Sequence, residues 1–475
     1  MDYQHFIINI NIGSSEVKKV IGLIILVCLI TQTPVCAIEE HHNSLKIQVK
    51  KSKKQPEKFF TLNPFWESYN DDLLNGYISE ALENNLDIKI AKTRIKESEA
   101  ILGTVNSQRL PRLSINPSIY PYKTISRWTG LYASHNMLYF PLLLDWELDI
   151  FGKLSDKVKS SKYEVQISEQ DLNIAKLSLA SEITASYFNI VLNDALIKNY
   201  EELISNLNET IKLKRQLYDG GIISYDNLYT TEYELVNRQN EFNSLSKKRE
   251  ILLHQFAVLR GISPENNTNI ERSAINGLKI PFDINIPIQS DLIYNRPDVM
   301  QAELGIKKAA IDVRVAKKMF LPSVNLNEMI GYEALRASRI FNWESTVYQL
   351  GAGALLDLYT GGYKMANLRY NKELATEKLH QYNNALLNAF CETENALSSL
   401  KTDSDSYDGF YKAMQKSEHY YQVANTRYTN GTGNRIDELD ARRQVIINEN
   451  SMYTAKICML IDSVDIYKSL GGRIQ

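Results

Sequence analysis

The segment KLSDKVKSSKYEVQISEQDL…IKLKRQLYD, residues 153–219, runs for 67 residues without a proline or a glycine. A second such segment, 222–260, follows after Gly220 and Gly221. The plan recurs later as two proline-free segments, 363–430 and 434–470. Proline and glycine disfavour helix interiors, so each segment is predicted to be one helix, the longest about 100 Å long. A globular core cannot cover such a helix, so its faces need partner helices.

The chain contains two copies of one unit. Pro111 and Asn84 recur 211 residues later as Pro322 and Asn295, and other matched positions are offset by 208 or 210 residues. Near-constant offsets along the whole chain indicate an internal repeat. We predict a signal peptide at 1–37, an extended segment at 38–75, a first repeat at 76–289 and a second at 290–475. Each repeat is predicted to hold a strand pair, a long helix and a shorter helix.

The strand pairs are predicted at 112–150 and 322–358, where apolar and polar residues alternate with a period of two. On the first return strand, for example, Leu144 faces away from Asp145. Such alternation fits a barrel wall between lumen and lipid, and it fits a half-buried hairpin of a soluble protein equally well. Pro117 weakens the first strand because proline cannot donate a hydrogen bond to a ladder.

The N-terminus has the pattern of a secretory signal peptide. Lys18-Lys19 precedes the apolar stretch 20–30, and small residues lead to a predicted cleavage after Ala37. Lipidation at Cys36 is the alternative, although Val35 stands where a lipidation signal favours a small residue. No later stretch has about 18 consecutive apolar residues, so no ordinary transmembrane helix is predicted.

Composition excludes several classes of function. Charged residues make up 23% of the chain and give a net charge of −2, which argues against a nucleic-acid partner. The seven histidines lack metal-ligand spacing, and no catalytic constellation is present, so we expect no metal, no cofactor and no enzymatic activity. Cys391 and Cys458 lie in predicted helices and are expected to be buried free thiols.

The first long helix carries two apolar seams, which predicts helical neighbours on both sides. Tyr200, Leu203 and Leu207 belong to one seam. Glu202 and Asn206 are predicted to lie on a separate solvated face. A ring of helices requires such an arrangement, whereas a simple bundle requires only one broad stripe.

Several motifs resemble those of the TolC-like outer-membrane efflux proteins, in the OprM or NodT branch. The stretch SDLIYNRPDVMQAE, residues 290–303, is similar to the family's most recognisable segment. LDIFG at 148–152 and LDLYTGG at 356–362 are similar to its joints between strand and helix. FWESYNDDL at 65–73 and ALENNLD at 81–87 are similar to its mature N-terminal region.

The resemblance implies a mainly helical protein with a small β part that assembles as a homotrimer. Each protomer would give four strands to one twelve-stranded barrel in the outer membrane of a Gram-negative bacterium. Its long helices would form an α-barrel through the periplasm. The implied function is the exit duct of a tripartite efflux pump, loaded through a periplasmic adaptor by a proton-driven or ABC-type inner-membrane transporter. A duct for type I protein secretion and a secreted coiled-coil scaffold are the alternatives.

The resemblance also places the functional residues at the helix breaks. By the match of 428–441 to the family's gate segment, Asp437 and Asp440 would form acidic rings, and Tyr428 would reach the first hairpin near Asp226. Some relatives carry a gate arginine where this chain has glycine, and Arg435 is two positions away. The turns predicted to contact the adaptor are formed by Gly220, Gly221, Ser224, Gly431 and Gly433.

Overall fold

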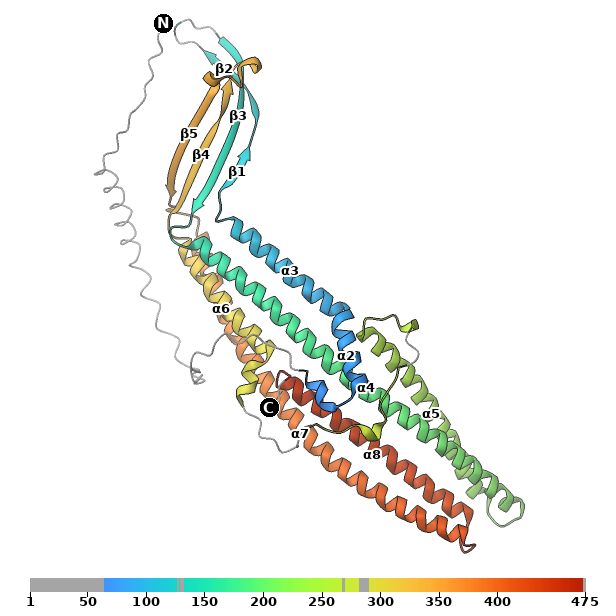
Figure 1. The fold of residues 1–475 in the computed structure, drawn as a ribbon. Coiled ribbons are helices and arrows are strands. Elements are labelled where there is room, and N and C mark those ends of the chain that lie inside the picture. The colour runs from blue at the N-terminus through green and yellow to red at the C-terminus, as the bar shows by residue number, and fades with distance from the viewer. Residues whose placement is uncertain (1–63, 126–127, 129–131, 267–269, 282–289, 473–475) are drawn as a thin grey trace.

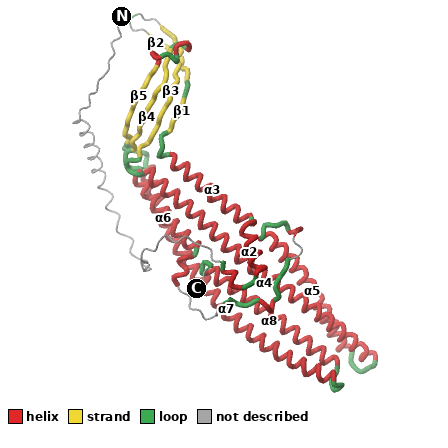
Figure 2. The backbone as a smooth tube through the Cα atoms, viewed as in Figure 1, coloured by secondary structure: helices red, strands yellow, loops and turns green. Residues whose placement is uncertain are grey.

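The chain forms an elongated molecule with a β-sheet at one end and a long helical body (Figure 1). The computed structural model describes residues 64–125, 128, 132–266, 270–281 and 290–472. The predicted signal peptide, including Cys36, lies outside these residues. Figure 2 shows that the two helical hairpins end together at the pole opposite the sheet.

Two long and two shorter helices build the body: α4 (Lys153–Asp219), α5 (Tyr225–Leu259), α7 (Tyr363–Thr429) and α8 (Arg435–Ser469). α7 includes Gly409 without a break, because one glycine costs only about 1 kcal/mol in a helix interior. α5 begins three residues later than its proline- and glycine-free segment, because Ser224 is extended at its N-cap. None of the helices in the described ranges is both long and apolar enough to cross a membrane.

Three further helices, α2 (Asp72–Asn84), α3 (Leu86–Ser107) and α6 (Pro297–Lys318), were not predicted as separate elements. α3 and α6 each precede a strand and extend each repeat toward the sheet (Figure 1). α4 packs against α3 and α6 near the sheet and against α5 and α8 toward the far pole, while α7 packs against α6 and α8. The body is therefore a layer of helices with α5 and α7 at its edges.

Residues 64–75 differ from the extended conformation predicted for 38–75. They form the 3-10 helix η1 (Phe65–Tyr69) and the first turn of α2. Phe65 stacks on Tyr467 at 5.1 Å between ring centroids, and the Tyr69 hydroxyl lies 2.7 Å from that of Ser463. Burial of these rings favours a compact turn over an extended segment. The other short helices are η2 (Pro264–Asn266), η3 (Ile275–Gly277), η4 (Ser290–Asn295), η5 (Ala337–Arg339) and η6 (Trp343–Ser345).

The sheet is antiparallel and contains β1 (Arg112–Ile115), β2 (Ser118–Ile125), β3 (Tyr132–Leu148), β4 (Ser323–Ala334) and β5 (Thr346–Leu355). β1 and β2 both pair with β3, so five strands occupy four positions. The predicted first strand is thus split at Asn116-Pro117, because proline offers no ladder donor. The remaining order is β3-β4-β5, which leaves β5 and β1/β2 as open edges.

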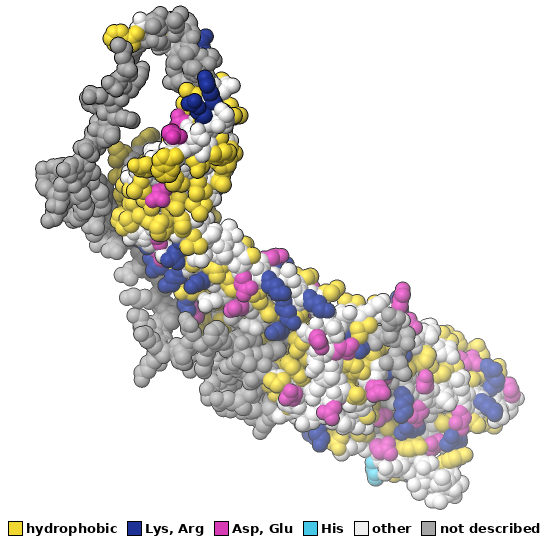
Figure 3. Space-filling model, turned by 45° about the horizontal axis from the view of Figure 1, so that its top comes forward, with side chains coloured by type: hydrophobic (Ala, Val, Ile, Leu, Met, Phe, Trp, Pro, Cys, Tyr) yellow, Lys and Arg dark blue, Asp and Glu magenta, His cyan; other side chains and the backbone are white. Residues whose placement is uncertain are grey.

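One face of the sheet is apolar and exposed. Leu142 lies opposite Ile115 on one side and Ile330 on the other, and Ile330 lies opposite Tyr348. The other face carries polar pairs such as Asp145 with Asn327. Figure 3 shows hydrophobic side chains gathered over the sheet, while charged side chains are scattered over the helices.

In each repeat, a side chain near the beginning contacts the end of the last helix, and the two contacts are equivalent. In the first, the Asn85 side chain donates to the Leu259 carbonyl at 2.9 Å, at the end of α5. In the second, the Arg296 guanidinium donates to the Ser469 carbonyl at 3.0 Å, at the end of α8. These positions are offset by 211 and 210 residues, so the internal repeat is visible in side-chain contacts.

The main core lies where α4 meets η1, α2 and α8, and it contains the fully buried rings of Tyr187 and Phe188. The predicted seam of α4 is confirmed, because Leu203 and Leu207 pack against Ile446 of α8 with Leu235 of α5 nearby. The expectation for the thiols was wrong at Cys391, which is exposed. The buried stripe of α7 runs through Ala389, Thr393, Ala396 and Leu400, and Cys391 lies off that stripe.

Candidate functional site

Both helical hairpins end in a five-residue turn of the same design, at 220–224 and 430–434. In each turn an amide donates to the carbonyl of the fifth residue before it, as in a Schellman motif. These bonds join Ile222 N to the Leu217 carbonyl and Thr432 N to the Arg427 carbonyl, both at 2.9 Å.

Glycine is required at defined points of these turns. Gly221 and Gly431 have φ values of 69° and 73°, in the left-handed region that other residues rarely adopt. At Gly433 a Cβ atom would lie 2.8 Å from the Arg427 Cβ and 3.0 Å from the Tyr428 amide nitrogen. A β-carbon at position 433 would therefore clash with the backbone at the end of α7, so this turn requires glycine there.

The structure brings some of the predicted gate residues together and leaves others apart. Asp437 and Asp440 lie near the start of α8, and Asp226 lies in the first turn of α5; all three are exposed. Tyr428 lies in the last turn of α7, under the Arg435 guanidinium, with 5.2 Å between the ring centroid and Cζ. Within the described part of the chain Tyr428 and Asp226 share no hydrogen bond, so the polar link to the first hairpin comes from Arg435 instead.

Arg435 joins the two hairpins through a forked ion pair. Its Nε and Nη2 atoms donate to the two carboxylate oxygens of Glu209 on α4, at 2.8 and 3.1 Å. Its Nη1 atom donates to the buried carboxylate of Glu438 at 2.5 Å. The hydrogen bond between Arg435 and Glu209 lowers the pKa of Glu209 and raises the pKa of Arg435. A two-point fork of this kind fixes geometry as well as charge.

Arg442, seven residues after Arg435, makes an equivalent contact with α4. Arg442 Nε donates to Glu202 on α4 at 2.6 Å, and its guanidinium lies 5.5 Å from the Tyr421 ring centroid. Between the two ion pairs, the Asn206 side chain donates to the Leu439 carbonyl at 2.9 Å. The prediction that Asn206 lies on a solvated face was wrong, because this contact buries it.

We call these three contacts, Arg435–Glu209, Asn206–Leu439 and Arg442–Glu202, the α4–α8 seam. Sequence reasoning missed it. The available signal was the spacing of seven residues between the two arginines and between the two glutamates, which places each pair on one helical face.

The two acidic residues of the predicted rings have different surroundings. Asp440 forms an ion pair with Arg443 at 2.9 Å, and Arg443 also donates to the Thr210 hydroxyl at 3.2 Å. Asp437 has no ion pair or side-chain hydrogen bond among the described residues. The charge of Asp440 is therefore partly balanced, whereas that of Asp437 is not.

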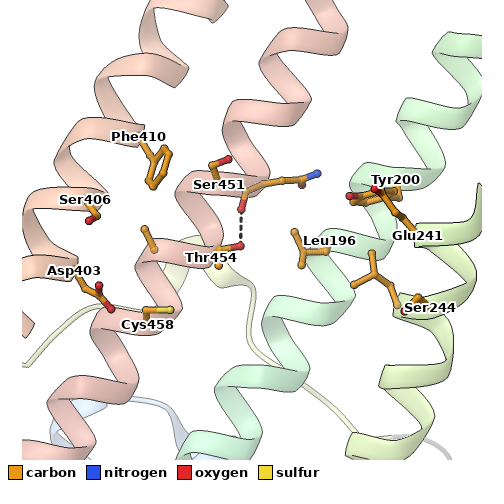
Figure 4. Close-up of a pocket in the computed structure, with 13 residues that line it drawn as sticks. Leu196, Tyr200, Glu241, Ser244, Asp403, Ser406, Phe410, Ser451, Thr454 and Cys458 are labelled. Carbon is orange, nitrogen blue, oxygen red and sulfur yellow. Dashed lines mark hydrogen bonds between the residues drawn. The ribbon is translucent and has the colours of Figure 1, made fainter. Parts of the chain in front are cut away.

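Farther from the tips, a cavity of about 700 Å³ lies between the hairpins, lined by residues of α4, α5, α7 and α8. Figure 4 shows Asp403 and Cys458 together at one side of it. Asp462 lies on α8 facing Asp403 of α7 closely enough for the two carboxyls to repel, and one buried Asp462 oxygen has no hydrogen-bond partner among the described residues. Burial, followed by repulsion from Asp403, raises the pKa of Asp462 to about 7.

Acidification is expected to strengthen the contact between α7 and α8 at this carboxyl pair. The folded pKa of Asp462 is about 7, whereas its ordinary value is 3.8, so between these values the folded state binds a proton that the unfolded state lacks. Stability should therefore fall as the pH rises from about 4 to 7. Thermal unfolding of the detergent-solubilised protein should show this slope, and Asp462→Asn should flatten it and raise the Tm above pH 7. An unchanged slope in Asp462→Asn would contradict the assignment.

The fold and its tips define a class of protein: an elongated body of long helical hairpins with, at one end, a β-sheet that is apolar on one face. Residues 77–259 and 288–472 match the family model described as outer membrane efflux protein. The chain belongs to this family, and it is an outer-membrane efflux channel protein.

Similar proteins align with most of the chain. The cation efflux system protein CusC of Escherichia coli K12 is 22% identical over 422 residues, which cover 86% of this chain and 89% of CusC. Nodulation protein T of Rhizobium leguminosarum bv. trifolii is 23% identical over 400 residues, covering 83% and 84%. The crystal structure of the Campylobacter jejuni CmeC outer membrane channel superposes with a TM-score of 0.78 at 25% identity, covering 88% and 90%.

Proposed function

We propose that this chain is the exit duct of a tripartite pump, a homotrimer that passes small molecules such as drugs or metal ions across the periplasm and the outer membrane. The observation that carries the proposal is that the β-sheet and the layer of helices each have two uncovered edges. The sheet ends at β5 and β1/β2, and an open sheet edge cannot face lipid. Three copies related by a threefold axis would close the edges.

The helical layer supports the same closure. Its edge helices carry exposed apolar and aromatic side chains that a single chain leaves uncovered. On α5 these include Tyr229, Tyr233 and Val236, and on α7 they include Tyr411 and Tyr420. Packing α5 of one protomer against α7 of the next would cover both sets and enclose a tunnel.

The apolar face of the sheet is then the lipid face, and the polar face lines the lumen. Trp146 near the helical body and Phe140, in the middle of β3 and opposite Tyr332 near the end of β4, both lie on the apolar face. They are six residues apart, or about 20 Å along the strand. This spacing is close to the height of an apolar band between two aromatic girdles.

The tips form the periplasmic entrance in this proposal. The turns at Gly220, Gly221, Ser224, Gly431 and Gly433 face the adaptor, which connects the duct to an inner-membrane transporter. The hairpin of α7 and α8 swings outward to open, and the α4–α8 seam holds it closed.

Loss of the Asp437 charge should reduce cation selectivity more than loss of the Asp440 charge. Three copies of an unpaired carboxylate attract cations, whereas Asp440 is already balanced by Arg443. Reversal potentials across planar bilayers under a salt gradient would compare Asp437→Asn with Asp440→Asn, and Glu250→Gln on the exposed surface of α5 is the matched control. Equal selectivity in the wild type and Asp437→Asn would place the acidic ring elsewhere.

A further inference from the structure

The loop between β4 and β5 folds back over the apolar face of the sheet at its far end. The Phe341 ring packs edge-on against Tyr332 and Phe140, with centroids 5.5 and 6.0 Å apart. Tyr332 and Phe140 are cross-strand partners on that face. The Arg339 carbonyl accepts hydrogen bonds from the Asn342 amide at 3.1 Å and the Ser345 hydroxyl at 2.8 Å. The loop thus has a defined shape.

Two arginines project from this loop. Arg336 precedes the 3-10 turn η5, and Arg339 ends it. Arg336 has an extended backbone at the N-cap of η5, so the two arginines stand at the two ends of one short turn, three residues apart. Both residues are exposed, and neither has an ion pair within the described ranges.

The same loop and the loop between β2 and β3 carry exposed aromatic side chains. Phe341 is 70% exposed even though its ring contacts the sheet, and Trp343 is 86% exposed. Trp128, in the neighbouring loop between β2 and β3, is 98% exposed. Exposed aromatic rings beside cations are costly in bulk water but favourable at a membrane interface, where rings sit at the level of the headgroups.

We propose that this loop patch, defined as Arg336, Arg339, Phe341 and Trp343, binds the phosphate groups of lipid in the outer leaflet. The inference rests on the proposed barrel, because a lipid-facing apolar face places the patch at the headgroup level. Phe341 and Trp343 would enter the acyl boundary while the two guanidinium groups bind phosphate oxygens above it.

The chemistry favours phosphate over other headgroup atoms. A guanidinium presents paired N–H donors that match two phosphate oxygens, and such charge-assisted bonds are about twice as strong as neutral ones. Among the described residues, neither Arg336 nor Arg339 forms an ion pair with a carboxylate, so an external anion is the complementary partner. A zwitterionic lipid offers the same phosphate with an adjacent cation, which the arginines would repel.

Native mass spectrometry of the purified full-length channel, titrated with phosphorylated lipid A and with dephosphorylated lipid A, tests the proposal. A chelator keeps divalent cations from bridging the phosphates. The wild type should bind the phosphorylated lipid about 10- to 30-fold more tightly than the dephosphorylated form, and Arg336→Gln with Arg339→Gln should abolish this preference. Arg336→Lys with Arg339→Lys should retain part of it, because charge remains while the paired donors are lost.

Lys247→Gln with Lys248→Gln is the matched control, since it removes two exposed positive charges from α5. Three results would each overturn the proposal. The lysine variant could lose the preference equally, the arginine variant could keep it unchanged, or millimolar inorganic phosphate could displace the lipid completely. The same spectra separate this failure from failure of the proposed function. A trimer without lipid preference would refute only the loop patch, whereas a monomer would refute the barrel on which it rests.

Discussion

Replacing Arg435 and Arg442 together by serine is expected to increase the fraction of open channels by about 100-fold. The variant removes both ion pairs of the α4–α8 seam, Arg435–Glu209 and Arg442–Glu202. The four side chains are 30–45% exposed, so each pair is worth about 0.5 kcal/mol. A trimer would lose six such contacts, about 3 kcal/mol in total, if the hairpins open together.

Recordings in planar bilayers measure this effect as the open probability of the channel and as the conductance that follows from it. The matched control is Arg215→Ser, because Arg215 pairs with Glu232 between α4 and α5, inside the first hairpin. Loss of that contact should leave the conductance unchanged. If the control opened the channel as much as the double variant, the seam would not be the contact that holds the hairpins closed.

Replacing Arg296 by alanine is expected to destabilise the folded protomer by about 3 kcal/mol. The Arg296 side chain is only 8% exposed, and it donates to Asp298, Glu392 and the Ser469 carbonyl. Its loss removes the contact between the start of α6 and the end of α8, and it leaves a buried carbonyl without this donor. Both carboxylates can regain water, which keeps the cost at the low end for a buried ion pair.

Thermal unfolding in detergent would compare Arg296→Ala with Arg314→Ala. Arg314 is 51% exposed and pairs with Asp156, so its loss should cost less than 1 kcal/mol. Arg296→Lys should restore part of the stability because it keeps the charge and loses the fork. Equal unfolding temperatures for the two alanine variants would show that the junction does not stabilise the protomer.

Sequence reasoning located the long helices because their limits are set by local chemistry. Proline and glycine mark the ends of α4 at Gly220 and of α7 near Gly431, and the chain needs no distant contact to stop there. α3 and α6 escaped prediction because Gly103 and Gly305 interrupt them, so neither forms a long segment free of proline and glycine. Pro117 was predicted to weaken the first strand, but the pairing of both resulting pieces, β1 and β2, with β3 depends on the strand opposite.

The candidate site was predictable in part. The tip glycines and the acids of α8 follow from the helix break and from the resemblance. The partner of Arg435 does not, because Glu209 lies 226 residues earlier in the chain and only the packing of α4 on α8 brings them together. Likewise, Asp440 matches the expected acidic pattern, but its pairing with Arg443 changes its electrostatic role.

The mass of the protein extracted by detergent from an outer-membrane fraction tests the central claim most directly. One chain of the full sequence has a mass of 54.4 kDa. We expect a particle whose protein mass is about three times that of the mature chain, roughly 150 kDa, released only by detergent. A monomer or dimer that salt or alkali releases would contradict the account, because the open edges of the sheet would then not be closed in lipid.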